Sequence, residues 1–103
     1  MNFEKHIYHQ LYLLVIDGTQ SMADIEFTDK ARAQLNELED ETSERILNKL
    51  KEVQDWPGHY LERLQGYPFY KIRVGDYRVI VDWEKEEKAI YVHNVGHRRN
   101  VYK

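Results

Sequence analysis

Basic and aromatic side chains with the chemistry to bind a polyanion gather in the last third of the chain. The candidates are Lys71, Arg73, Arg78, His97, Arg98, Arg99 and Tyr102. Lysine and arginine bind phosphate oxygens through charge-assisted hydrogen bonds, and an exposed aromatic ring can stack on an unpaired base. The pattern therefore predicts a surface that binds a phosphodiester and an unstacked base.

Two strands joined by a tight turn are predicted for residues 70–80, YKIRVGDYRVI. If Gly75 and Asp76 form a two-residue hairpin loop, Arg73 lies directly opposite Arg78. Like charges set opposite each other destabilise a strand pair. A phosphate-binding role explains the pair, because a polyanionic ligand relieves the repulsion.

Period-two alternation places Lys71 and Arg73 on one face of the first strand and Ile72 and Val74 on the other. Directly opposed residues point the same way, so Arg78 joins the two cations. The alternative is a solvated face whose cations only discourage edge-to-edge pairing of sheets. The cations and the tyrosine at the C-terminal end favour the binding face.

Charge is unevenly distributed, although the net charge of −3 by itself argues against a nucleic-acid partner. Residues 66–103 carry eight Lys/Arg and five Asp/Glu, a net charge of +3. Residues 22–65 carry six basic and eleven acidic side chains, a net charge of −5. A basic end on an acidic body predicts one anion-binding surface.

Composition excludes or disfavours several classes of protein. The chain has no cysteine, which excludes disulfides and cysteine-ligated zinc and favours a cytoplasmic location. Its five histidines are scattered, so no metal site is predicted. The longest apolar run, residues 11–16, is much shorter than the roughly 20 residues of a membrane-spanning helix. At 103 residues, one soluble domain with one core is expected.

Helices are predicted in the first half of the chain. A short strand over residues 22–27 leads into a helix capped by Thr28, with apolar residues at helical spacing. A polar break at residues 39–43 separates this helix from a second one, which ends near Trp56 because proline follows.

Strands are predicted in the second half, after a linker at residues 59–68. They cover residues 69–74, 77–83 and 88–95. His93 is expected to pack in the sheet on the same side as Tyr91 and Val95. The expected fold is α+β, in the order β-α-α-β-β-β, with a helical hairpin packed on one face of a mainly antiparallel sheet.

Four segments together resemble the RelE branch of the RelE/ParE toxin superfamily: MADIEFTDKA, LQG at residues 64–66, YKIRVGDYRVI and VGHRRNVY. The resemblance covers residues 22–103, which are expected to form a RelE-like toxin domain. Residues 1–21 lie outside the resemblance and are expected to be an N-terminal extension.

The resemblance implies the toxin of a type II toxin–antitoxin system. Toxins of this branch are ribosome-dependent endoribonucleases that cleave messenger RNA (mRNA) in the ribosomal A site. The ribose 2′-hydroxyl attacks the adjacent phosphorus and leaves a 2′,3′-cyclic phosphate and a free 5′-hydroxyl. The implied partners are a cognate antitoxin and mRNA on the ribosome, with ribosomal RNA contacts; no metal, small-molecule cofactor or membrane is implied.

Matching motifs carry the site residues of the family onto this chain. The implied catalytic residues are Lys71, Arg73, Arg78, Arg98 and Tyr102. The implied RNA-binding residues are Lys71, Arg73, Arg78, His97, Arg98 and Arg99. Arg73 and Arg78 would stabilise charge on the nonbridging oxygens. Arg98 would serve the leaving 5′-oxygen, and Tyr102 would stack on a base.

The group that removes the 2′-hydroxyl proton is left open by the sequence. Lys71 is the only lysine in the cluster, and neighbouring cations can lower the pKa of a lysine until it is partly neutral. Members of the family often have lysine where this chain has Arg73. His97 titrates near neutral pH in its reference state and is the other candidate for acid or base work.

Two other functions remain as alternatives. A ParE-like toxin shares the fold and poisons DNA gyrase by binding it, but that branch generally lacks the complete set of Lys71, Arg73, Arg78 and Arg98. A non-catalytic module that keeps only its antitoxin contact is the third possibility, and the acidic body of the chain favours it.

Overall fold

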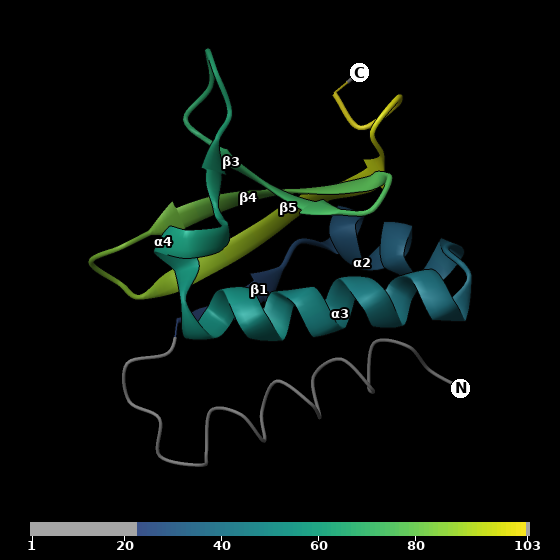
Figure 1. Ribbon diagram of the computed structural model, residues 1–103, viewed down its shortest axis with the longest axis horizontal. Helices are drawn as coiled ribbons and strands as arrows, with labels where there is room; N and C mark the ends of the chain where they lie inside the picture. The colour runs from purple at the N-terminus through teal and green to yellow at the C-terminus, as the bar shows by residue number, and fades with distance from the viewer. Residues whose placement is uncertain (1–22, 103) are drawn as a thin grey trace.

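A five-stranded sheet with helices on one side forms the part of the chain that the structure, a computed structural model, describes: residues 23–102 (Figure 1). The elements are, in chain order, β1 (Asp24–Phe27), α2 (Asp29–Glu37), α3 (Asp40–Asp55), α4 (Pro57–Tyr60), β2 (Glu62–Arg63), β3 (Tyr70–Val74), β4 (Tyr77–Glu84) and β5 (Ala89–His97). The expected extension at residues 1–21 and the boundary at Met22 lie outside the described residues.

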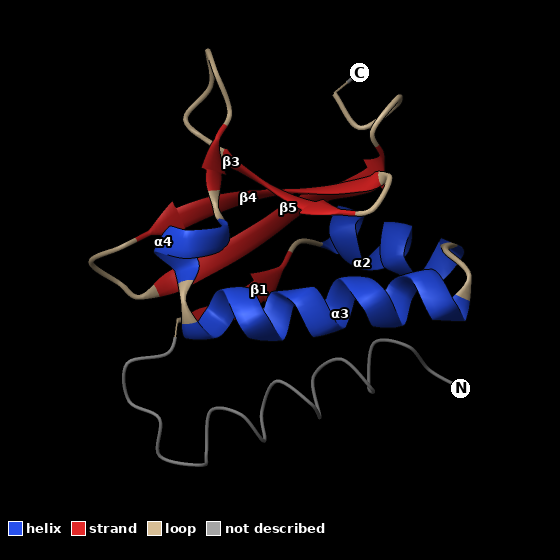
Figure 2. Ribbon diagram, in the orientation of Figure 1, coloured by secondary structure: helices blue, strands red, loops and turns tan. Residues whose placement is uncertain are grey.

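The strands lie in the order β1-β5-β4-β3-β2 (Figure 2). β1 runs parallel to β5, and every other neighbouring pair is antiparallel. α2 and α3 lie together on one side of the sheet (Figure 2). The predicted α+β fold, with a helical hairpin on one face of a mainly antiparallel sheet, is therefore confirmed.

The start of α2 is as predicted, but the break before α3 is shorter. Thr28 Oγ1 accepts a hydrogen bond from the Ala31 N–H at 3.1 Å, which satisfies a free donor at the helix N-terminus. α3 already begins at Asp40. Ser43 is buried inside α3, where its hydroxyl donates to the Leu35 carbonyl at 2.9 Å. Its polarity therefore marks a hydrogen bond between the two helices instead of a break.

One hydrophobic core fills the space between the helices and the sheet. Leu35, Ile46 and Leu50 from the helices and Ile72 and Val79 from the sheet are each at most 1% exposed. Burying a side chain of this size stabilises the fold by about 1.5–3 kcal/mol. The other side of the sheet carries the loop between β2 and β3 and the C-terminal turn (Figure 1).

The predicted linker at residues 59–68 contains the end of α4 and the whole of β2. The predicted helix end is confirmed, since α3 ends at Asp55, and Pro57 then begins α4, where its missing N–H is not needed. β2 has two residues, which pair with Tyr70 and Lys71 at the outer edge of the sheet. Neither element is long enough to show a period in the sequence.

A β-bulge in β5 changes which of its side chains face the helices. The register shifts between Ile80 and Val81, so that His93 is an extra residue in β5. Val95 packs in the core, whereas the ring of His93 lies 5.4 Å from that of Phe69. The prediction that His93 and Val95 share a side is wrong, because the bulge interrupts the alternation between them.

β5 continues past the end of β1, and there it forms hydrogen bonds with the side chain of Gln34 in α2. The Val95 N–H donates to Gln34 Oε1 at 2.7 Å, and Gln34 Nε2 donates to Asn94 Oδ1 at 2.6 Å. Asn94 Nδ2 in turn donates to the Val101 carbonyl at 2.8 Å. These bonds connect α2, through β5, to the C-terminal turn.

Candidate nucleic-acid interface

The hairpin of β3 and β4 has the predicted register. Arg73 pairs with Arg78, and Gly75 and Asp76 form the two-residue loop. Gly75 has a φ of +59°, a conformation that glycine adopts without strain. The two arginines therefore lie next to each other on a short hairpin.

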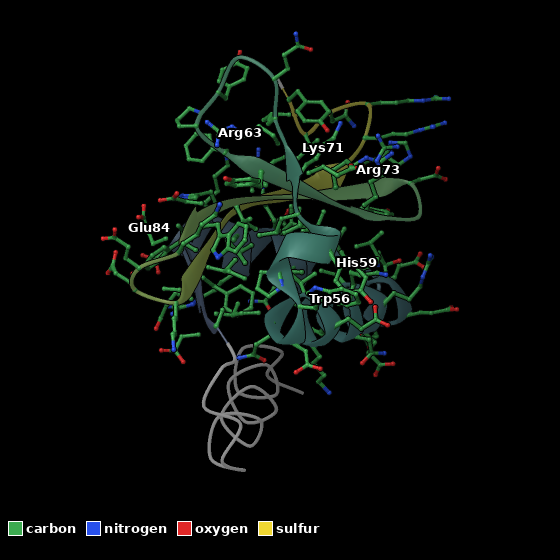
Figure 3. All side chains as sticks on the ribbon, turned by 60° about the vertical axis from the view of Figure 1, so that its left-hand side comes forward. Trp56, His59, Arg63, Lys71, Arg73 and Glu84 are labelled. Atoms are coloured by element: carbon green, nitrogen blue, oxygen red, sulfur yellow. The ribbon has the colours of Figure 1, made fainter. Side chains whose placement is uncertain are left out.

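Lys71, Arg73 and Arg78, called the basic face from here on, lie on the side of the sheet away from the helices. Their strand neighbours Ile72 and Val79 are buried in the core, so the alternating side chains point the other way. Figure 3 shows Lys71 and Arg73 above the sheet, opposite the helices. Arg73 is exposed, and the other two cations are half-buried. The three cations share one face, as the alternation predicts.

A carboxylate that the sequence did not single out lies beside the basic face. Glu62 in β2 pairs with Lys71, and its Oε2 accepts a hydrogen bond from Arg73 Nε at 2.7 Å. This hydrogen bond is the main cause that lowers the pKa of Glu62, and the charges of Arg73, Lys71 and Arg78 lower it further. In the sequence, Glu62 is only one acidic residue in the predicted linker. Such a residue is too common to indicate a position beside the basic face.

The hairpin turn positions both Arg78 and Arg98. Arg78 Nη1 donates to the carbonyls of Gly75 and Tyr77, each at 2.8 Å. The backbone N–H of Arg98 donates to the Asp76 carbonyl at 2.8 Å, and its Nε lies 3.7 Å from Asp76 Oδ1. A single turn thus holds two arginines that are distant in the sequence.

The C-terminal turn folds back over the basic side of the sheet. Val101 is buried, and its Cβ lies 3.5 Å from the place that a Cβ on Gly96 would occupy. Gly96 pairs with Arg78 of the basic face. Tyr102 is 52% exposed and lines a cavity of about 440 Å³ together with Lys71. The predicted aromatic residue therefore lies close to the predicted lysine.

His97 lies on the other side of the sheet from the basic face. His97 pairs with Tyr77, whose side chain packs against the core, and the two rings lie 5.6 Å apart. Because paired residues point the same way, His97 lies on the helical side of the sheet. Its Nδ1 accepts a hydrogen bond from the Arg99 N–H at 3.2 Å, so neutral His97 carries its proton on Nε2. Arg99 is exposed in the C-terminal turn, and the structure does not bring His97 to the basic face.

The interface offers cations, the carboxylates of Glu62 and Asp76, and aromatic rings. Within residues 23–102, no three His, Asp or Glu side chains are grouped so that they could hold a metal ion. Over the same range, no helix is long and apolar enough to cross a membrane.

A family model matches almost all of the described residues. Its description is the ParE toxin of the type II toxin–antitoxin system parDE, and the match covers residues 25–102. The fold and this match define the class: the chain is a toxin of a type II toxin–antitoxin system. It belongs to the ParE toxin family, within the RelE/ParE toxin superfamily.

Solved toxins share the fold. The toxin in the intact E. coli RelBE toxin–antitoxin complex matches with a TM-score of 0.63 and 27% identity, over 71% of this chain and 93% of that chain. A double arginine-to-alanine mutant of E. coli RelE in the free state matches with a TM-score of 0.64 and 26% identity, over 74% of this chain and 83% of that chain. The archaeal RelE–RelB complex from Pyrococcus horikoshii matches with a TM-score of 0.65 and 21% identity, over 78% of this chain and 99% of that chain. A search of curated proteins finds no match.

Proposed function

We propose that this toxin is a ribosome-dependent endoribonuclease that cleaves mRNA in the ribosomal A site. The observation that supports this function best is the basic face, with Arg73 and Arg78 paired on the hairpin and Arg98 held at its turn. Fixed cations of this kind stabilise the charge that develops on phosphate oxygens during phosphoryl transfer. The acting domain comprises residues 22–103 and works in the cytoplasm, where it reaches ribosomes.

The proposed reaction needs no group beyond the chain, its RNA and water. The ribose O2′ attacks the adjacent phosphorus, and the bond between phosphorus and O5′ breaks. The O2′ proton passes to a base on the protein, and O5′ takes up a proton from water to leave as a hydroxyl. Arg73 and Arg78 bind the nonbridging oxygens, and Arg98 stabilises the charge on O5′.

Lys71 in the basic face and Glu62 beside it are the two candidates to accept the O2′ proton. The hydrogen bond from Arg73 lowers the pKa of Glu62 and therefore makes Glu62 a weaker base. The proton acceptor in this proposal is accordingly Lys71, which lines the same cavity as Tyr102. Glu62 neutralises Arg73 until RNA binds, and Tyr102 stacks on a base.

A cognate antitoxin is the proposed protein partner. The E. coli and P. horikoshii relatives were solved as complexes of a RelE toxin with a RelB antitoxin. An acidic or helical segment of such a partner would occupy the basic face in place of RNA. The other proposed partners are mRNA and ribosomal RNA, and the proposal includes no cofactor or membrane.

Primer extension on translated messages after induction tests this function. Wild type is expected to create new 5′ ends within codons, and Arg78→Ala and Arg98→Ala are each expected to lose about 100-fold or more of this cleavage. Lys30→Ala removes an exposed cation from α2 and serves as the matched control, with cleavage like wild type. Equal cleavage by all four proteins would refute the site assignment.

Binding to DNA gyrase is the second candidate function, and the helical side of the molecule favours it. Trp56 is 62% exposed, and its ring stacks on that of His59 at 4.3 Å (Figure 3). Tryptophan is enriched among the residues that dominate protein–protein binding. DNA breaks trapped by gyrase after induction, lost in Trp56→Ala and retained in Arg78→Ala, would establish this function in place of RNA cleavage.

A further inference from the structure

The cavity beside the basic face has an apolar floor and aromatic walls. Ile80 and Val101, both buried, form part of the floor, and Tyr67, Phe69 and Tyr102 line the sides. Its volume of about 440 Å³ lies within the range of roughly 300–1,000 Å³ typical of sites for small organic ligands. The cavity therefore suits a flat, largely apolar group.

The walls of the cavity are held in place by the fold. The Leu64 N–H donates to the Phe69 carbonyl at 2.9 Å, and the Tyr67 N–H donates to the Leu64 carbonyl at 3.1 Å, which closes the loop between β2 and β3. Phe69 packs on the extra residue of β5, His93. Val101 on the floor is held by the hydrogen bond from Asn94. The backbone that frames the cavity, and the ring of Phe69, are thus held in place before a ligand binds.

Two side-chain amides line the cavity, and only one is available to a ligand. Asn94 is engaged, because its Nδ2 donates to Val101 and its Oδ1 accepts from Gln34. Gln65 is exposed at the cavity and has no hydrogen-bond partner among the described residues. Its amide offers one acceptor and two donors, the groups that pair with the edge of a nucleobase.

We propose that Gln65 reads the edge of the RNA base that stacks in this cavity. The inference rests on the proposed function. Lys71 belongs to the basic face and also lines the cavity, so a base in the cavity lies next to a phosphate on the basic face. Aromatic walls stack on the base, and Gln65 makes the toxin prefer one base beside the scissile phosphate.

Mapping of cleavage sites by sequencing 5′-hydroxyl RNA ends tests the role of Gln65. The readout is the ratio of cleavage among the four bases at each position next to the cut, which a general loss of activity does not change. Gln65→Leu is expected to reduce the preference at one position by about fivefold or more. Asn36→Leu, which replaces an exposed amide on α2, is the matched control and is expected to keep the wild-type ratio.

Saturation-transfer NMR with the four nucleoside monophosphates and with ribose 5-phosphate tests the cavity without cleavage. Base protons of at least one nucleotide are expected to receive saturation from wild type and to lose most of it in Tyr67→Ala. Ribose 5-phosphate, which lacks the base, is expected to show no signal that depends on Tyr67.

The two readouts separate failure of the cavity from failure of the nuclease. RNA cleavage whose base ratios are the same in wild type and Gln65→Leu overturns the inference and leaves the proposed function standing. Nucleotide binding that depends on Tyr67 in a toxin that cleaves no RNA supports the cavity and overturns the proposed function. An effect of Gln65→Leu on antitoxin binding alone overturns the inference, because the cavity then holds a protein side chain.

Discussion

Among single residues, Glu62 controls how much positive charge the basic face presents. Its carboxylate accepts a hydrogen bond from Arg73, which lies opposite Arg78 in the hairpin. The negative charge therefore reduces the repulsion between the two arginines. The side chains of this ion pair are 58% and 49% exposed, and exposed ion pairs contribute only about 0.2–1 kcal/mol. A phosphate group can therefore displace Glu62 from Arg73 at little cost.

Replacing Glu62 with glutamine is expected to tighten RNA binding. The change frees Arg73 from a carboxylate and removes one negative charge from the site, and the energy of an exposed pair corresponds to a gain in affinity of up to about fivefold. Fluorescence anisotropy with a short RNA that carries a 2′-deoxy group at the scissile position measures this. Asp29→Asn on α2 is the matched control; weaker binding by Glu62→Gln would show that the carboxylate contacts RNA favourably.

The same pair makes a small contribution to stability that depends on pH. Because Arg73 lowers the pKa of Glu62 in the folded protein, the pair stabilises the fold above the unfolded pKa of glutamate, about 4.3. This contribution is lost as the pH falls through the lowered pKa. The free energy of unfolding of wild type is expected to exceed that of Glu62→Gln by about 0.2–1 kcal/mol at pH 7 and to match it near pH 2. Urea unfolding at both pH values measures the difference.

The two substitutions Lys71→Met and Lys71→Arg distinguish a proton acceptor from a phosphate contact. Loss of a general base costs about 10²–10⁴-fold in rate, so Lys71→Met is expected to be severely impaired. Arginine keeps the charge but does not deprotonate, so Lys71→Arg is expected to stay equally impaired while it binds RNA like wild type. Single-turnover cleavage and anisotropy measure the two properties. Recovery of the rate by Lys71→Arg would assign Lys71 to phosphate binding.

At the scale of elements, the turn between β3 and β4 decides whether the arginines meet. Gly75 has positive φ, and a Cβ there would lie 2.7 Å from Arg45 Nη2, the end of a flexible side chain. The backbone conformation therefore dominates, and Gly75→Ala is expected to lower the free energy of unfolding by about 1–2 kcal/mol. Gly58→Ala in α4 has open space and is expected to be neutral or stabilising. Equal thermal unfolding of the two variants would argue against strain at the turn.

The bonds of Gln34 make α2 part of the interface. Gln34→Ala removes the acceptor for the Val95 N–H and the donor to Asn94, which in turn positions the carbonyl before Tyr102. An unpaired buried group costs about 1–3 kcal/mol, so this variant is expected to be less stable by that amount. Hydrogen exchange is expected to be faster at the Val95 amide, and the exchange rates of the amides in the core strand β4 are expected to change less. Uniformly faster exchange would show a general loss of stability instead.

Local patterns predict the hairpin, and long-range contacts place the rest of the site. The alternation around Gly75 and the two-residue loop are sufficient to pair Arg73 with Arg78, and capping chemistry at Thr28 predicts the start of α2. Glu62 lies in a strand of two residues that forms only against β3, so no period in the sequence reveals it. The side on which His97 lies follows from a strand that continues past the bulge, which strand-length rules do not predict.

At the scale of the whole molecule, the cations of the basic face and Arg98 gather at the end of the sheet that carries the β3–β4 turn. The acidic segment, residues 22–65, contributes the helices that cover one side, and the basic segment, residues 66–103, contributes the hairpin and the C-terminal turn (Figure 1). Asp82 and Glu84 lie farther along β4 on the same side as Arg78. RNA is therefore attracted to the end of the sheet that carries the hairpin turn and repelled by the acidic helices and by the far end of β4, which orients the toxin before it makes specific contacts.

The dependence of RNA binding on salt tests this arrangement. For single strands, the logarithm of the binding constant falls with the logarithm of salt concentration by about 0.7 for each phosphate that the protein neutralises. Arg78→Ala and Arg98→Ala are each expected to make the slope less steep, by at most about 0.7, because each removes a cation from the scissile phosphate. Lys30→Ala removes the same charge from the helical side and is expected to leave the slope unchanged. A change in slope for Lys30→Ala and none for the two arginine variants would place the RNA on the helices, whatever the affinity of wild type.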